Sequence, residues 1–439
     1  MPPDSPNNTF PPAFKDIGVV EGFYGEVWRP AARYWFIEQL MPYGLNTYLY
    51  APKHEKAFGA ELLRPLAKAE SQRLEELAGF LTEREITPWA GLHFEPPFHP
   101  QNPDHQQRAA ARVAELWRMG YRGFAVLFDD LASHLKNPDG TAATGGSLAQ
   151  AQAAAFNGVR AEAERRGVGA RWWVCPSKYT LDALLIREYG EFEEGYLDKL
   201  HAGLPPDVAW FWTGPRVCST TVAPADRQAF MGNLHRPLVL WDNYPVNDAS
   251  MVNFLHLGPL SGRAADLPQA VESYLFNPMS QAILGAVPGA TCLLYANNPT
   301  GYDTEDAWET VLEDFLPPEA RLAVDAFEAL TRRSNLTDRS AEQRRAPFGR
   351  GEALRALLES HWAKQDLPIP EDLSREWKDL MRQVQAGLPP EMAEEAAPWL
   401  ERLEQAWAIF SAATPTSRNE QIMRFRQGKA FVLGKWFNP

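Results

Sequence analysis

Two aspartates, Asp129 and Asp130, stand side by side directly after the apolar run FAVLF at residues 124–128. A buried strand that ends in adjacent carboxylates is costly, because like charges repel each other and burial opposes ionisation. Three interpretations are open. One aspartate caps the next helix while the other is solvated; the two hold Mg²⁺; or they cleave a glycosidic bond, which needs one protonated and one ionised carboxyl group.

The residues that accompany the aspartate pair favour the third interpretation. The sequence adds no suitable second carboxylate cluster and no glycine-rich phosphate loop, which weakens the metal interpretation. Two adjacent aspartates in a pocket bind their first proton more tightly, because their charges repel each other. Aromatic and hydrogen-bonding side chains, which suit the faces and hydroxyl groups of a sugar, stand after other apolar runs. They are Tyr24, Phe94, Tyr179, Trp212, Trp241 and Tyr244, and Lys53, Asn243, Asp248 and Asn277.

The elements that must position these side chains are short apolar runs alternating with helix-like segments. The runs cover residues 17–23, 46–52, 86–94, 123–130, 171–179, 208–215, 237–245 and 273–278, and the helix-like segments include 31–41, 60–82, 106–119, 147–166 and 187–202. This alternation predicts βαβ units and a parallel sheet. Strands that are apolar on both faces favour a closed (β/α)₈ TIM barrel, with a doubly wound open sheet as the alternative.

The eighth strand has two candidates. The run TCLLYANN at 291–298 reads as a strand equally well, in which case 273–278 belongs to a preceding helix. We prefer 273–278, because Asn277 then joins the other polar residues at the carboxyl ends of the strands, where the active sites of this fold lie.

After about residue 301 the strand-like runs end and helix-period segments take over. They cover residues 305–315, 318–333, 341–364, 371–386, 391–412 and 420–436. We therefore predict a disordered or extended segment at 1–15, a catalytic barrel at 16–300 and an α-helical bundle at 301–439. We expect the bundle to stabilise the barrel or to form a homodimer contact rather than to take part in catalysis.

Composition limits the partners and the location. The chain has 439 residues, 45% of them hydrophobic, which predicts a folded protein, and its formal net charge of −13 disfavours nucleic acid and anionic membranes as partners. No apolar run is long enough to span a bilayer. The three cysteines, Cys175, Cys218 and Cys292, have no metal-binding spacing, and no secretory signal is visible. We expect reduced thiols and a cytoplasmic location, with a trimmed signal as the alternative.

Several of these motifs resemble those of family 84 glycoside hydrolases, the O-GlcNAcases and related β-N-acetylglucosaminidases. The similar segments are GVVEGFYG (18–25), NTYLYAPK (46–53), LFDD (127–130), WTGP (212–215), WDNYPVND (241–248) and the Asn-Pro of LFNP (275–278). One segment and one residue depart from the family pattern. They are GLHFEPPFHP (91–100), on the leaving-group side, and Lys178, where an acidic residue is expected.

The resemblance implies substrate-assisted retaining hydrolysis, in which the 2-acetamido oxygen of the sugar forms an oxazoline. Asp129 would orient the acetamide N–H, and Asp130 would protonate the leaving oxygen and later deprotonate water. The resemblance also implies substrate-binding roles for Gly22, Lys53, Tyr179, Trp241, Asn243, Asp248 and Asn277. In these roles Tyr179 lies near the oxazoline, Asn243 holds the acetamide, Trp241 walls the acetamide methyl, and the others bind sugar hydroxyls.

The leading hypothesis is a retaining exo-β-N-acetylglucosaminidase that acts on β-GlcNAc glycosides or O-GlcNAc-modified proteins, with no cofactor and no metal. Three alternatives stay open: a metal-dependent hydrolase on the same barrel, an endo-acting hyaluronidase-like enzyme and a non-catalytic sugar-binding scaffold.

Overall fold

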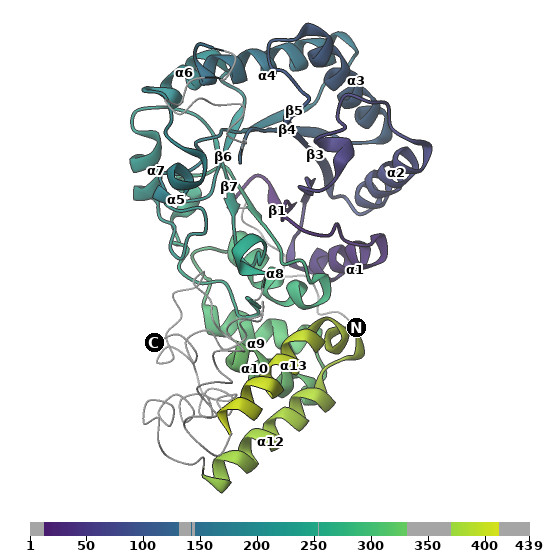
Figure 1. Ribbon diagram of the computed structural model, residues 1–439, viewed down its shortest axis with the longest axis vertical. Helices are drawn as coiled ribbons and strands as arrows, with labels where there is room; N and C mark the ends of the chain where they lie inside the picture. The colour runs from purple at the N-terminus through teal and green to yellow at the C-terminus, as the bar shows by residue number, and fades with distance from the viewer. Residues whose placement is uncertain (1–12, 131–141, 143–144, 253, 332–369, 412–439) are drawn as a thin grey trace.

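The computed structural model describes residues 13–130, 142, 145–252, 254–331 and 370–411. Eight parallel strands form a closed barrel in the order of the sequence, with β8 paired to both β7 and β1 (Figure 1). The strands are β1 (Ile17–Glu21), β2 (Thr47–Tyr50), β3 (Thr87–His93), β4 (Gly123–Leu127), β5 (Arg171–Cys175), β6 (Ala209–Trp212), β7 (Leu238–Asp242) and β8 (Ser273–Phe276). The predicted TIM barrel is confirmed, and the open sheet is excluded.

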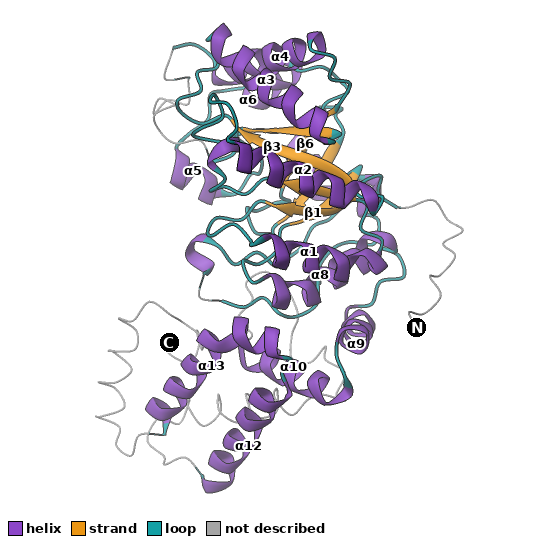
Figure 2. Ribbon diagram, turned by 90° about the vertical axis from the view of Figure 1, so that its right-hand side faces the viewer, coloured by secondary structure: helices purple, strands orange, loops and turns teal. Residues whose placement is uncertain are grey.

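Helices follow the strands and form the outer layer of the barrel (Figures 1 and 2). They are α1 (Pro30–Leu40), α2 (Lys68–Glu83), α3 (Pro103–Met119), α4 (Leu148–Arg165), α5 (Ala183–Tyr189), α6 (Tyr196–Gly203), α7 (Pro224–Met231) and α8 (Ala282–Asn297). The preferred eighth strand is confirmed, because the competing run at 291–298 lies largely within α8.

Two predicted helices are wrong in their extent. The segment 60–82 becomes helical only from Lys68, after Pro65, because a proline disfavours helical backbone in the residue before it. The segment 187–202 is divided between α5 and α6, which Gly190 and Gly195 separate with φ values of 79° and 66°. Those positive φ values are the conformation that glycine adopts readily and that ends a helix.

Alternation along the strands divides the core into two layers. Side chains such as Val20, Leu127 and Val239 point into the barrel, where Trp89 and Trp173 stack with ring centroids 3.4 Å apart. Their neighbours in the sequence, such as Val19, Val126 and Leu240, pack outward against the helices. The period of two in side-chain direction therefore decides which residues at a strand end face the inside of the barrel.

Further helices follow the barrel: α9 (Thr304–Phe315), α10 (Pro318–Thr331), α12 (Glu371–Gly387) and α13 (Pro390–Phe410). Figure 2 shows them gathered at one end of the molecule, and α13 contacts α8 of the barrel. The predicted helices at 341–364 and 420–436, and residues 1–12 of the predicted N-terminal segment, lie outside the described residues.

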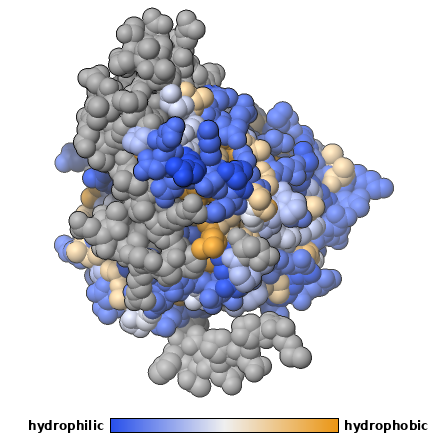
Figure 3. Space-filling model, turned by 90° about the horizontal axis from the view of Figure 1, so that it is seen from below, coloured by the Kyte–Doolittle hydropathy of each residue, from blue (hydrophilic) through white to orange (hydrophobic). Residues whose placement is uncertain are grey.

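The surface at this helical end is mainly hydrophilic over the residues that are coloured in Figure 3. Within the described ranges, no helix has the length and apolar character needed to cross a membrane.

Candidate active site

A cavity of about 410 Å³ opens where the carboxyl ends of the strands meet. It is lined by residues at or after the ends of β1, β2, β4, β5, β6, β7 and β8. All the predicted site residues line it: Gly22, Lys53, Asp129, Asp130, Tyr179, Trp241, Asn243, Asp248 and Asn277. The structure thus brings the predicted set together in one place, while the role of each residue stays a prediction.

The two aspartates reach the cavity by different routes. Asp129 continues the inward-facing series of Ala125 and Leu127, so its side chain faces the inside of the barrel. Asp130 is in the opposite phase, but its backbone has a φ of +51°, in the left-handed region. This conformation is uncommon for a residue other than glycine and turns the chain at the strand end, so that both carboxylates line one cavity.

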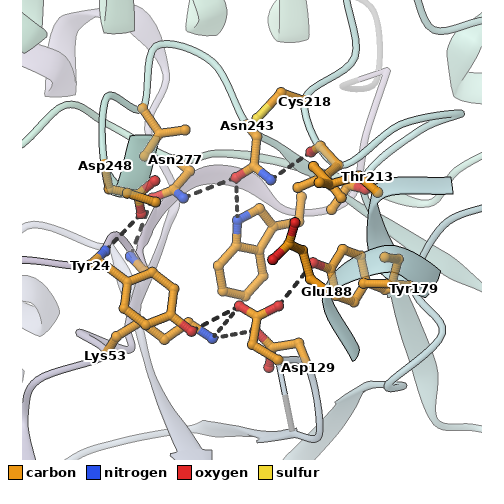
Figure 4. A pocket seen from close by; sticks show the side chains of 18 of the residues that line it. Tyr24, Lys53, Asp129, Tyr179, Glu188, Thr213, Cys218, Asn243, Asp248 and Asn277 are labelled. Carbon is orange, nitrogen blue, oxygen red and sulfur yellow. Dashed lines mark hydrogen bonds and ion pairs between the residues drawn. The ribbon is translucent and has the colours of Figure 1, made fainter. Parts of the chain in front are cut away.

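The Asp129 carboxylate is paired on one oxygen only. The Lys53 ammonium donates to its Oδ2 (Figure 4) and lies 3.9 Å from Oδ2 of Asp130. Burial opposes the charge on Lys53, but the two aspartates outweigh it and raise the pKa of the amine. Oδ1 of Asp129 is buried and accepts no hydrogen bond from any residue that the structure describes. A buried carboxylate oxygen in this state is an acceptor for a donor group of a ligand.

Asp130 accepts hydrogen bonds from two phenols. The Tyr24 hydroxyl donates to Oδ2 at 2.9 Å, and the Tyr179 hydroxyl donates to Oδ1 at 3.0 Å. Burial and the charge of Asp130 raise the pKa of both tyrosines, so that both stay protonated and act as donors. Tyr189 at the end of α5 also lines the cavity, and burial together with Asp130 raises its pKa.

Trp241, Asn243 and Asn277 form a connected wall, and Figure 4 shows the contact between the two asparagines. The Trp241 Nε1–H donates to Oδ1 of Asn243 at 3.1 Å, and Nδ2 of Asn277 donates to the same oxygen at 3.0 Å. Oδ1 of Asn277 accepts from the backbone N–H of Gly22 at 3.4 Å, and Nδ2 of Asn243 donates to the Val217 carbonyl at 2.7 Å. These contacts fix the amide orientations and hold the indole in place.

Asp248 forms the adjoining side of the cavity. Its Oδ2 accepts from the backbone N–H of Tyr24 at 2.7 Å, so it ties the loop after β7 to the loop after β1. Burial raises the pKa of the Asp248 carboxyl group, and the Tyr24 N–H and the charge of Lys53 act in the opposite direction.

Three aromatic residues in the predicted sugar-binding set lie in the core instead. Trp212 is fully buried in the outer layer, where it stacks on Phe230, and Phe94 stacks on Phe98. The Tyr244 hydroxyl donates to the carbonyl of Gly258. The prediction that Trp212 and Phe94 line the sugar site fails for one reason, which is that the residue before each takes the inward phase of its strand. Phe211 lies in the inner layer, and His93 is four residues after the inward-facing Trp89.

Sequence reasoning missed several lining residues. Cys175 and Thr213 have the inward phase of β5 and β6, which was a usable signal. Val217 and Cys218 come from the loop after Thr213. The short helix α5 forms a further wall that no polar residue at a strand end predicts. Its lining residues are Leu184, Leu185, Arg187, Glu188 and Tyr189.

Two carboxylates at strand ends have structural partners outside the cavity. Glu21 accepts two hydrogen bonds of 2.7 Å from Arg33 and one of 2.6 Å from the Tyr48 hydroxyl. Asp242 is held in the same way by Arg263. Both acids point to the outer layer, which leaves Asp129, Asp130, Glu188 and Asp248 as the carboxylates that line the cavity among the described residues.

The arrangement can perform acid–base chemistry on a neutral polar ligand. One carboxylate has a free buried oxygen and a neighbouring ammonium, and the other is held by phenols at the cavity surface. No group of three or more His, Cys, Asp or Glu side chains is placed to hold a metal ion in the described part of the chain.

The sequence of this chain is similar to that of known proteins. Residues 17–329 match a sequence model of the β-N-acetylglucosaminidase family. Two curated proteins named Protein O-GlcNAcase, from Rattus norvegicus and Mus musculus, are each 28% identical over 273 residues, or 60% of this chain. The chain spans only 28% of the length of those relatives.

The fold also has a solved counterpart. The structure of a mutant O-GlcNAc hydrolase from Thermobaculum terrenum superposes with a TM-score of 0.75 at 24% identity, covering 97% of this chain and 93% of that one. The likeness supports the barrel with its C-terminal helices. The family match extends over well more than half of the sequence, so the chain belongs to the β-N-acetylglucosaminidase family of glycoside hydrolases.

Proposed function

We propose that this glycoside hydrolase is a retaining exo-β-N-acetylglucosaminidase that uses the acetamido group of its substrate as the nucleophile. The observation that carries the proposal is the unpartnered, buried Oδ1 of Asp129, which lies beside a second carboxylate in a cavity with an aromatic wall. A 2-acetamido sugar supplies the missing N–H donor.

In the first step the acetamide carbonyl oxygen bonds to the anomeric carbon, and the bond from that carbon to the leaving oxygen breaks. Asp129 accepts the acetamide N–H and stabilises the positive charge that develops on the oxazoline ring. Lys53 holds the other oxygen of Asp129, which leaves Oδ1 aimed at the ligand. A charged acceptor placed where the charge develops stabilises the transition state more than the ground state.

Asp130 moves the protons in both steps. It donates a proton to the leaving oxygen and then takes a proton from the water that attacks the anomeric carbon and opens the oxazoline. Tyr24 and Tyr179, which donate to its two oxygens, stabilise the carboxylate form that exists between the steps. Two displacements at one carbon retain its configuration.

The wall of the cavity supports recognition of one sugar unit. The fixed amides of Asn243 and Asn277, the carboxylate of Asp248 and the amine of Lys53 offer directional partners for hydroxyl groups, and Trp241 offers an apolar surface. The O-GlcNAc group of proteins is the proposed natural substrate, because the rat and mouse relatives are named for that activity.

A comparison of three substrates tests the proposal. We expect an aryl β-GlcNAc and an O-GlcNAc peptide to be hydrolysed, whereas an aryl β-glucoside, which lacks the acetamide, should react at least about 10²-fold more slowly. A thiazoline analogue of the oxazoline should inhibit. Equal turnover of the glucoside and the aryl β-GlcNAc would refute the acetamide mechanism.

Variants of the aspartates separate the two roles. Asp130→Asn should abolish turnover of substrates with poor leaving groups and spare aryl glycosides with good ones, since those need no proton. Asp129→Asn should impair both, because oxazoline formation itself suffers. Dialysis against EDTA tests the alternative of a metal-dependent hydrolase. For that alternative, activity should disappear with the chelator and return when the metal is added back.

A further inference from the structure

One carboxylate of the helical region binds backbone N–H groups of barrel helix α8. Glu395 on α13 accepts hydrogen bonds from two backbone N–H groups at the start of α8, from Ile283 to Oε1 at 3.1 Å and from Leu284 to Oε2 at 2.8 Å. Burial raises the pKa of Glu395, and these N–H groups act in the opposite direction. The first N–H groups of a helix have no partner within the helix, so Glu395 caps α8 from a different part of the chain.

Helix α8 has no cap of its own. Gln281 occupies the N-cap position without a side-chain capping hydrogen bond, and the first turn contains no acidic residue. The side chain of Gln281 is engaged elsewhere, because its Oε1 accepts from Nδ2 of Asn247 at 2.7 Å. Glu395 therefore supplies the hydrogen-bond acceptors for the first N–H groups of α8, which no residue at the start of α8 supplies.

The start of α8 is connected to the sugar-binding side of the cavity. The short loop from β8 to α8 begins with Asn277, whose amide joins Asn243 and Gly22. Its other end is held by Asn247, whose Oδ1 accepts from the Ser280 backbone N–H at 3.0 Å. Asn247 is buried and directly precedes Asp248. The position of the α8 N-terminus thus bears on both Asn277 and Asp248.

We propose that Glu395 is a positioning residue for the active site: by capping α8, it holds the loop that places Asn277 and, through Asn247, Asp248. The helical region then contributes to substrate binding from outside the barrel, beyond the stabilising role expected from its sequence. The inference rests on the proposed assignment of Asn277 and Asp248 to the sugar hydroxyls.

The adjacent residue provides a matched control. Glu394 has the same charge and lies on the same helix, but its side chain is exposed, whereas that of Glu395 meets the α8 backbone. With the full chain and an aryl β-GlcNAc, Glu395→Ala should raise KM about five- to ten-fold with kcat within about two-fold of wild type. The Ki of the product N-acetylglucosamine should rise by the same factor. Glu394→Ala should leave both constants unchanged.

Glu395→Gln gives a graded second variant. Its amide oxygen can accept from one N–H group, so its KM and Ki should lie between those of wild type and Glu395→Ala. If Glu395→Ala does not fold, the KM and Ki of Glu395→Gln still test the positioning role of Glu395. A Glu395 variant with wild-type KM and Ki overturns the inference, and so does a fall in kcat at unchanged KM, which reports a partly unfolded sample.

The same assay distinguishes failure of the inference from failure of the proposed function. If wild type does not hydrolyse the aryl β-GlcNAc, the proposed function fails. If wild type is active and inhibited by the thiazoline while the Glu395 and Glu394 variants behave alike, only the role of Glu395 is refuted.

Discussion

Gly22 occupies a position where even one methyl group reorganises the active site. A Cβ atom added there would lie 2.3 Å from Cζ2 and 2.7 Å from Cη2 of Trp241. Ordinary contact begins at 3.4 Å, so the indole has to move by about 1 Å in Gly22→Ala. The alternative, a shift of the backbone after β1, displaces Tyr24, which donates to Asp130.

The size of the loss of activity in Gly22→Ala follows from the hydrogen bond that the Trp241 indole makes. Its Nε1–H bonds Asn243, which Asn277 also contacts, so the movement of Trp241 disturbs the wall of the cavity. A misplacement of about 1 Å in an active site can cost about 10²-fold in rate. We expect kcat/KM on an aryl β-GlcNAc to fall by about 10²-fold, and overpacking to lower the free energy of unfolding by about 1–3 kcal/mol.

Gly79→Ala is the matched control. Gly79 lies within α2, where an added Cβ has nothing within 4 Å. That variant should keep full activity and gain up to about 1 kcal/mol in stability, because alanine favours a helix. Kinetics and urea denaturation of both variants provide the test. Full activity in Gly22→Ala would show that the close packing of Trp241 on the β1 loop does not matter for catalysis.

Two further substitutions test charges in the core. Burial lowers the pKa of His256 from 6.5 to about 3, so the unfolded chain binds a proton that the folded chain excludes, and stability should fall by about 1.4 kcal/mol per pH unit as the pH drops below 6.5. Urea denaturation at pH 7 and pH 5 should show a smaller loss in the free energy of unfolding for His256→Leu than for wild type. The exposed His235→Gln is the control and should behave like wild type, and an equal loss in His256→Leu and wild type would contradict this expectation. Arg33→Met leaves Glu21 charged and buried without its guanidinium, which should cost about 3–5 kcal/mol by urea denaturation, whereas Arg33→Met with Glu21→Gln should recover part of the loss. Wild-type stability of Arg33→Met would refute the expectation that Glu21 needs its buried guanidinium partner.

The barrel was predictable because its strands carry a strong, repeated signal. Each predicted apolar run contains one strand of the barrel, and the polar residues after the runs bring the predicted site together. The wall formed by α5 was not predicted from strand ends, because α5 lies beyond the end of β5 and the predicted helix at 187–202 overlaps only its last residues. The contact between Glu395 and α8 joins positions 111 residues apart in sequence, and no local pattern marks such a pair.

Side-chain phase explains most of the errors in the site prediction. The series Leu49, Ala51 and Leu275 points into the barrel, and continuing the same phase past the strand ends reaches the cavity. The positions reached in this way are Gly22, Tyr24, Lys53, Asp129, Tyr179, Thr213, Asn243 and Asn277. Following every second residue from the core would therefore have added Thr213 to the predicted site and removed Trp212 from it. The aromatic character of Trp212 alone was misleading.

Asp130 is the residue that phase alone would have sent away from the cavity. A strand that continued regularly through Asp129 would place the next side chain among the outer helices, where Glu21 and Asp242 each need a buried arginine. Strand β4 ends at Leu127 instead, and the positive φ at Asp130 turns the second carboxylate to the side of the first. A conformation of that kind costs about 1–3 kcal/mol in a residue other than glycine, and the hydrogen bonds from Tyr24 and Tyr179 help to offset it. Two neighbouring acids can therefore serve one sugar only because the chain leaves the strand geometry between them, and that break is a property of the folded backbone rather than of the two residue types.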